Sequence, residues 1–98
     1  MILVTGSIVA RPGTLDALIA HSLEHVRRSR GEPGCVSHAV HRDVENPLRL
    51  VFVEEWTDRA ALAAHFAVPA SGAFVKAASA LAAEPPSIRI YDATPAKL

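Results

Sequence analysis

The sequence lacks a second cysteine and lacks an excess of charge of either sign. Its 98 residues contain one cysteine, Cys35, so no internal disulfide can form. Ten basic and ten acidic side chains cancel, and neither sign forms a run, so nothing supplies the field that nucleic acid or an anionic lipid surface requires. We therefore expect no nucleic-acid partner. The amino end carries no charged leader or small-residue cleavage site, which predicts a cytoplasmic protein.

Long apolar runs and the common catalytic motifs are missing as well. The longest apolar stretches are interrupted by His, Glu, Pro or Ser well before the ~18 residues that a membrane span requires. There is no glycine-rich phosphate loop, no cysteine pair, no His-Glu-x-x-His and no Gly-x-Ser-x-Gly. We therefore expect no membrane partner, no bound nucleotide, no zinc motif and no serine-type acyl transfer.

The sequence does contain enough hydrophobic material for one core. Half of its residues (50%) are hydrophobic, and 98 residues fit a single domain over residues 1–98, with a tail from about residue 94 that we expect to fray. Strand-like runs occupy residues 2–10, 35–42, 48–56 and 87–91. Apolar residues at helical spacing from Leu15 to Val26, with Thr14 as N-cap, predict a first helix. Residues 58–83 predict one helical crossover broken at Pro69.

The order strand-helix-strand-strand-helix-strand is that of the ferredoxin-like α+β fold, with a four-stranded antiparallel sheet and both helices on one face. The sequence makes both faces of that sheet apolar. On the third strand, Phe52, Glu54 and Trp56 point one way, while Val51 and Val53 point the other way. An uncovered apolar face is unusual for a monomer, so we expect a homodimer that buries sheet against sheet.

His65 is the first candidate for a functional residue. It follows Leu62 by three positions and precedes Phe66, so it lies on the inward side of its helix, where a polar ring needs a partner or a purpose. Two interpretations stay open. The ring is either a structural histidine bonded to a backbone carbonyl or a group that takes part in catalysis or ligand binding.

The other histidines are weaker candidates. His21 and His25, four residues apart, could clamp a metal, but both point away from the apolar stripe of their helix and no third ligand is evident. We therefore expect a solvated helix face and no metal. On the second strand, His38 and His41 point to opposite faces, and His38 is preferred as the one beneath the helices.

Glu54 and Trp56 each allow two interpretations. A carboxylate among apolar neighbours tends to have a raised pKa or a fixed donor, and such a group can orient an imidazole. The alternative for Glu54 is an ion pair with Arg42 or Arg49 at the edge of the sheet. Trp56 is either core or a flat wall for an aromatic ligand.

Several short motifs occur in a fixed order along the chain. They are Glu32-x-Gly34-Cys35, a hairpin over residues 43–47, Val53-Glu54-x-Trp56-x-Asp58, Ala61-Leu62-x-x-His65-Phe66, and Phe74 after the break at Pro69. Each motif is weak alone, but the ordered combination is fairly specific and covers nearly the whole chain. In this order the motifs resemble the antibiotic biosynthesis monooxygenase (ABM) domain family of small quinol monooxygenase-like proteins.

The resemblance implies a dimeric α+β barrel with a pocket between sheet and helices. It further implies oxidation of a phenolic or quinol-like aromatic by O2 without metal or flavin. His65 would be the base or the anchor of the phenolate, with Glu54 as its orienter. The substrate would contact five further residues, namely His38, Phe52, Trp56, Phe66 and Phe74.

Two departures from the family pattern limit what the resemblance implies. Members commonly carry a Pro-His-Phe-like stretch after the His65 position, whereas Pro69 is followed here by Ala70 and Ser71, so a second polar group is missing. The positions that the haem-degrading branch uses hold Gly6, His65 and Ala78, which argues against haem degradation.

Two other activities stay open. A non-catalytic binder of a small apolar aromatic would use the same pocket without any titrating group. The family also includes an isomerase of a phosphorylated signalling sugar, but the basic residues of this chain are scattered, so this alternative ranks below the oxygenase.

Overall fold

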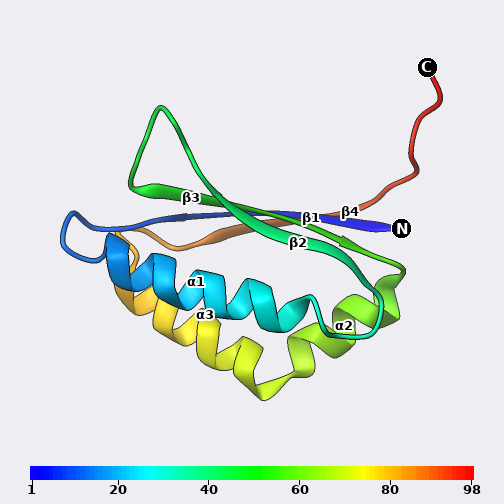
Figure 1. Ribbon diagram of the computed structural model, residues 1–98, viewed down its shortest axis with the longest axis horizontal. Coiled ribbons are helices and arrows are strands. Elements are labelled where there is room, and N and C mark those ends of the chain that lie inside the picture. The colour runs from blue at the N-terminus through cyan, green and yellow to red at the C-terminus, as the bar shows by residue number, and fades with distance from the viewer.

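The computed structural model describes residues 1–98 and has the predicted ferredoxin-like α+β architecture. Its four strands form one antiparallel sheet in the order β2-β3-β1-β4. All three helices lie on one face of that sheet, and the opposite face carries none (Figure 1). The elements are β1 (Ile2–Val9), α1 (Leu15–Ser29), β2 (Cys35–Arg42), β3 (Arg49–Trp56), α2 (Arg59–Ala67), α3 (Pro69–Leu81) and β4 (Ser87–Asp92).

The strand ends differ from the predicted ones by a single residue. Strand β1 ends one residue early because Ala10 leaves the ladder and forms a separate bridge with Ala82. The start of β3 moves to Arg49, and β4 extends to Asp92, where the ladder with β1 reaches Ile2. Pairing with the neighbouring strand therefore sets where each strand begins and ends, and the alternation of apolar residues in the sequence does not show this pairing.

Helix α1 packs against β2 and α3 through a stripe of small and apolar side chains. Leu18, Ser22, Val26 and Ser29 are completely or almost completely buried, and the two serines are small enough for close packing. Thr14 is the N-cap residue of α1, as predicted, but its side chain does not cap the helix. Its Oγ1 makes no hydrogen bond to the helix amides and instead donates to the Leu81 carbonyl at 2.6 Å, because α3 ends beside it.

The predicted broken crossover is confirmed as two helices, α2 and α3. Asp58 caps α2 by accepting a 2.8 Å hydrogen bond from the Ala61 amide. Pro69 is the first residue of α3, a position that requires no amide hydrogen. No single helix is long and apolar enough to cross a bilayer. The α2–α3 pair passes that test together, with a bend of 71° between its halves.

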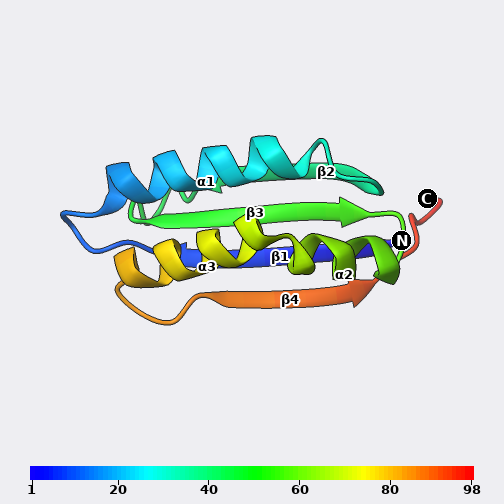
Figure 2. The same cartoon turned by 90° about the horizontal axis from the view of Figure 1, so that it is seen from below.

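The helices divide the covered face of the sheet unevenly. Helix α1 runs over the side of β2, and α2 with α3 runs over the middle of the sheet, which leaves β4 at the uncovered edge (Figure 2). Ile88 and Ile90, the β4 residues on the helix side, are therefore about half exposed. Two apolar clusters lie beneath the helices. On β3, Glu54 is placed between Phe52 of the first cluster and Trp56 of the second.

The face without helices is more mixed than the sequence predicted. Leu3, Val51 and Val53 lie on it, but strand pairing also places polar side chains there, including Arg49 and Arg89. Those two arginines line a polar pocket on this face, together with residues of β1 and β4. Burial of this face in a homodimer stays a prediction.

Gly34 gives a test of how the turn between α1 and β2 is built. Its φ of +82° is left-handed, and a Cβ there would overlap Ala61 and lie 2.8 Å from Thr57 Oγ1. We expect Gly34→Ala to lower the free energy of unfolding by about 2–4 kcal/mol, from strain and overpacking together. Gly72→Ala is the control, because its Cβ would meet nothing within 4 Å and the helix should gain up to about 1 kcal/mol. Urea unfolding measures both, and equal stability of Gly34→Ala and the parent would contradict this account.

Candidate active site

A cavity of about 350 Å³ opens between the sheet and the α2–α3 pair. Gly6 forms part of its floor. On β1 it holds the helix-facing position between Val4 and Ile8, and because it has no side chain it leaves this space empty. Most of the lining is apolar, and a few polar side chains reach the space from the helices and from β3. The apolar walls are Ile8, Phe52, Phe66, Phe74, Val75 and Ile88, and the polar groups include His25, Glu54, His65 and Ser71.

His65 reaches the cavity from α2 and is almost fully buried. Its Nδ1 lies 2.8 Å from Oε1 of Glu32, which belongs to the turn between α1 and β2. A carboxylate can only accept a hydrogen bond, so this contact assigns the imidazole proton to Nδ1. The Nε2 of His65 therefore carries the free lone pair, and it is the nitrogen that can accept a proton in the cavity.

His25 reaches the cavity from α1 with the opposite arrangement of its proton. Arg28 lies 2.7 Å from its Nδ1, and because a guanidinium can only donate, Nδ1 is the acceptor and the proton lies on Nε2. The ring stacks on Phe74, with centroids 4.1 Å apart and 10° between the planes. Burial, then the neighbouring His38 and His65, and then Arg28 lower the pKa of His25 to about 3. The ring is therefore neutral at physiological pH.

His38 and Glu54 lie on neighbouring strands, with Glu54 at the wall of the cavity and His38 behind it. His38 is completely buried, and its Nε2 lies 3.2 Å from Glu54 Oε1 without the alignment of a hydrogen bond. The same oxygen accepts a 3.0 Å hydrogen bond from Trp56 Nε1. Burial alone would raise the pKa of Glu54, but His38 and Trp56 outweigh it and the pKa lies below its usual value. Glu54 is thus a buried carboxylate that accepts a hydrogen bond from Trp56 and lies beside the His38 ring.

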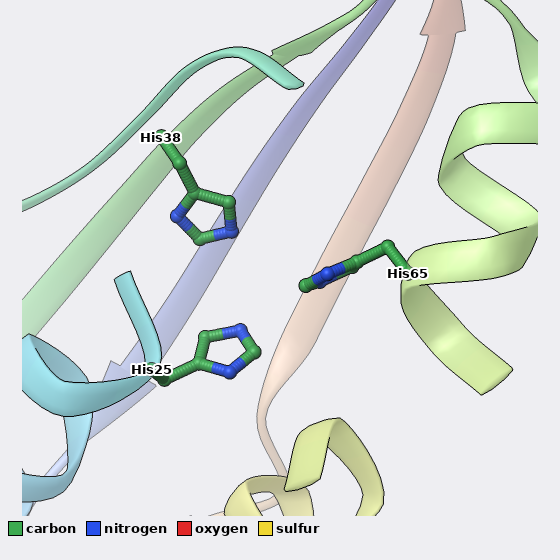
Figure 3. Close-up of side chains that lie close together, drawn as sticks. All are labelled: His25, His38 and His65. Carbon is green, nitrogen blue, oxygen red and sulfur yellow. The ribbon is translucent and has the colours of Figure 1, made fainter. Parts of the chain in front are cut away.

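The three histidines converge from three different elements (Figure 3). One nitrogen from each ring lies within 4.8 Å of the other two, so these are the residues of the chain that could hold a metal ion. A metal would need the lone pair of His25 on the nitrogen that faces the other rings. Arg28 places the proton on that nitrogen, which opposes metal binding. The absence of a metal therefore stays a prediction.

Comparison with known proteins agrees with this architecture. The sequence profile of the antibiotic biosynthesis monooxygenase family matches residues 1–77. The chain belongs to the antibiotic biosynthesis monooxygenase family. The matched part contains His25, Glu32, His38, Glu54 and His65, and it ends before β4.

Individual relatives support the family and the fold. A crystal structure described as an antibiotic biosynthesis monooxygenase is 30% identical, with a TM-score of 0.89 over 97% of this chain and 100% of that one. Rv0793 from Mycobacterium tuberculosis shares the fold, with a TM-score of 0.90 at 22% identity over 97% of this chain and 96% of that one. The uncharacterized protein sll1783 from Synechocystis is 38% identical over 92% of this chain. The chain spans only 61% of the length of that relative.

The structure brings together most of the residues selected from the sequence. Phe52, Glu54, His65, Phe66 and Phe74 all line the cavity. The remaining two do not reach it. His38 is buried beneath the rings, and Trp56, also completely buried, packs against His65 with centroids 4.6 Å apart. Trp56 therefore supports the histidine from behind and does not form a wall of the cavity.

Two interpretations of Glu54 need correction. It is not ion-paired with Arg42 or Arg49, because it points under the helices, and Arg49 pairs instead with Asp43. Nor does it hydrogen-bond His65, because the carboxylate that does so is Glu32. Glu32 stands in a motif that carried the family resemblance, but nothing in the sequence indicated a contact with a residue 33 positions later.

The expectation for His25 was wrong. It is 6% exposed, whereas His21, one turn earlier, is on the solvent side. The sequence held a signal for this, because Ser22, His25 and Ser29 continue the inward stripe at spacings of three and four residues. Ser22 and Ser29 therefore indicated that the buried face of α1 includes polar residues. His25 and His38 supply the second and third polar rings that the sequence around Ala70 did not offer.

The lowered pKa of His25 predicts a specific dependence of stability on pH. Below pH 6.5 the unfolded chain protonates this histidine, whereas the folded chain resists protonation until about pH 3, so stability falls as the pH falls through this window. The cost between pH 6.5 and pH 5 is about 2 kcal/mol. The groups that face the ring are His38, His65, Glu54 and Arg28.

Replacement of His25 with Phe should remove this loss and keep the stacking on Phe74. Urea unfolding at pH 7, 6 and 5 measures the effect, with His21→Gln on the exposed side of α1 as the control that keeps the parent slope. Parallel curves for the parent and His25→Phe would show that His25 is not the group responsible.

Proposed function

We propose that the chain is a monooxygenase that oxidises a small phenolic or quinol-type aromatic with O2, without metal or flavin, in the cavity beneath α2 and α3. The observation that carries the proposal is the His65–Glu32 hydrogen bond at the wall of an apolar cavity. A base with a fixed tautomer and an apolar space for a ring and O2 are the two things that such a reaction requires. The family of the chain supports the same reaction class.

The cavity has a suitable size and lining for this substrate class. Its volume of about 350 Å³ falls at the lower end of small-molecule sites, which matches one or a few fused rings. Phe52, Phe66 and Phe74 offer aromatic surface on different sides. Because His25 and His65 lie together at the wall of this cavity, with ring centroids 5.2 Å apart, the substrate would be oriented with its hydroxyl toward His65.

The proposed reaction needs one base, which removes the phenolic proton and later returns it to the peroxide. Nε2 of His65 takes the phenolic proton, and Glu32 stabilises the imidazolium that forms. The electron-rich anion then reduces O2, and a carbon–oxygen bond forms at an activated ring carbon that bears hydrogen. The resulting peroxide regains the proton from His65. Its O–O bond breaks with loss of the hydrogen on that carbon, so one oxygen stays as a carbonyl and the other leaves as water.

Two further features belong to the proposal. We propose that residues 1–98 act as one domain, and that a homodimer forms through the sheet face without helices. The apolar residues Leu3, Val51 and Val53 on that face favour sheet-to-sheet burial.

Oxygen uptake by chelator-treated protein with a panel of dihydroxynaphthalenes and anthrones tests the activity. We expect uptake with one oxygen atom of 18O2 found in the product. His65→Ala should lower kcat by about 10²–10⁴-fold, because the general base is lost. His41→Gln, on the exposed side of β2, is the control and should keep the parent rate. Ligand binding without any oxygen uptake would instead identify a binder.

Glu32→Gln separates orientation of the base from the base itself. The amide can present its NH2 group to Nδ1, which favours the wrong tautomer of His65. We expect kcat to fall about 10–100-fold, as for other partners that orient an imidazole, with little change in KM. Steady-state kinetics measure both values. An unchanged kcat would remove Glu32 from the mechanism while leaving the role of His65 intact.

A further inference from the structure

Two histidines of the cavity present opposite hydrogen-bonding groups to the same space. Arg28 leaves the Nε2–H of His25 as a donor, and Glu32 leaves the Nε2 of His65 as an acceptor. We propose that these two nitrogens together bind one phenolic hydroxyl, which His65 deprotonates and His25 then holds as the phenolate. The proposal rests on the proposed function for the phenolic class of substrate, and it adds His25 and Arg28 to the site.

The spacing of the rings suits a single oxygen atom between them. One ring nitrogen of His25 lies within 4.8 Å of one ring nitrogen of His65, and the ring centroids are 5.2 Å apart. Two nitrogens at that upper limit would both lie about 2.8–2.9 Å from one oxygen, with an angle at the oxygen of about 110–120°. That angle is the one at which a hydroxyl donates one hydrogen bond and accepts another.

The charges around the two rings favour transfer of the proton in one direction. When the phenolic proton moves to His65, the imidazolium lies beside Glu32 and within the field of Glu54. The phenolate oxygen then receives one hydrogen bond from that imidazolium and one from His25. Because only the proton moves, the cavity keeps its total charge.

His25 is suited to be a fixed, uncharged donor. Stacking on Phe74 fixes the plane of its ring, and Arg28 fixes its tautomer. Burial and the nearby histidines lower its pKa, so the ring stays neutral and donates without adding a second positive charge. A site with this neutral donor distinguishes a phenol, which has an ionisable hydroxyl, from related rings that lack one. A methyl ether of the same ring can neither donate to His65 nor form the phenolate, and it should bind at least about 100-fold more weakly.

A coloured phenol tests the proposal without any turnover. Under argon, 4-nitrophenol is titrated with the protein at a pH below the pKa of the free phenol, and the absorbance of the phenolate is followed. We expect the bound ligand to be phenolate, with 4-nitroanisole bound at least about 100-fold more weakly in equilibrium dialysis. His25→Phe keeps the stacking on Phe74 but removes the donor. It should weaken phenolate binding about 10–100-fold, the effect of one hydrogen bond to a charged group, and leave 4-nitroanisole unaffected.

A second variant guards against a folding defect in His25→Phe. Arg28→Met leaves His25 in place but no longer fixes its tautomer, and it should reduce the phenolate signal in the same direction. His21→Gln, on the exposed side of the same helix, should bind like the parent. Equal phenolate binding by all four proteins, or a bound ligand that stays neutral, would overturn the proposal.

Zinc provides an independent check of the tautomers. Zn²⁺ would take the lone pair of the nitrogen that the proposal leaves protonated on His25, so we expect no tight zinc binding by the parent and a gain of affinity in Arg28→Met. Micromolar zinc binding by the parent that His25→Phe abolishes would contradict the assignment. Because none of these measurements needs O2, absent oxygen uptake with intact phenolate binding would refute the oxygenase alone.

Discussion

The hydrogen bond between Glu32 and His65 is the interaction on which the rest of the site depends. It joins the turn after α1 to the middle of α2, two segments that belong to different halves of the fold, and it decides which nitrogen of His65 faces the cavity. The turn that carries Glu32 is itself constrained by Gly34, whose left-handed backbone leaves no room for a side chain beside Ala61. Local backbone geometry, placement of the helix and the protonation state of a buried ring are thus parts of one arrangement.

A second consequence is the way in which the chain accommodates several polar groups in a small core. His25, His38, Glu54 and His65 are all buried, and unpaired they would cost far more than a domain of this size can tolerate. Arg28 pairs with His25, Glu32 with His65 and Trp56 with Glu54, whereas both ring nitrogens of His38 lack a hydrogen bond. These partners leave one nitrogen of His25 and one of His65 free on the inner side. The polar cluster is therefore stable in the fold and still available to a ligand.

The sequence predicted the fold well because the fold follows from periodicity. Alternation on β1 and β3, the helical stripe of α1, and the break at Pro69 are local patterns, and the strand ends moved by only one residue. His65 was found in the same way, from its spacing to Leu62. Glu32 could not be found, because its partner lies 33 residues away and no local rule connects a turn to a distant helix.

His25 was missed for a different physical reason. The buried face of α1 had been defined by apolar residues alone, whereas its inner part is lined by serines and a histidine that face other polar groups. The cavity was also beyond the reach of the sequence. It lies above Gly6, which has no side chain, and beneath two helices whose relative angle of 71° no local pattern gives.

The uncovered position of β4 has a consequence for the cavity. All the histidines, Glu32 and Glu54 precede this strand in the sequence. Ile88 on this strand borders the cavity and is half exposed at its edge. Substitutions in the last strand can therefore reshape the opening, and with it the range of rings admitted, while the proton-handling groups remain as they are.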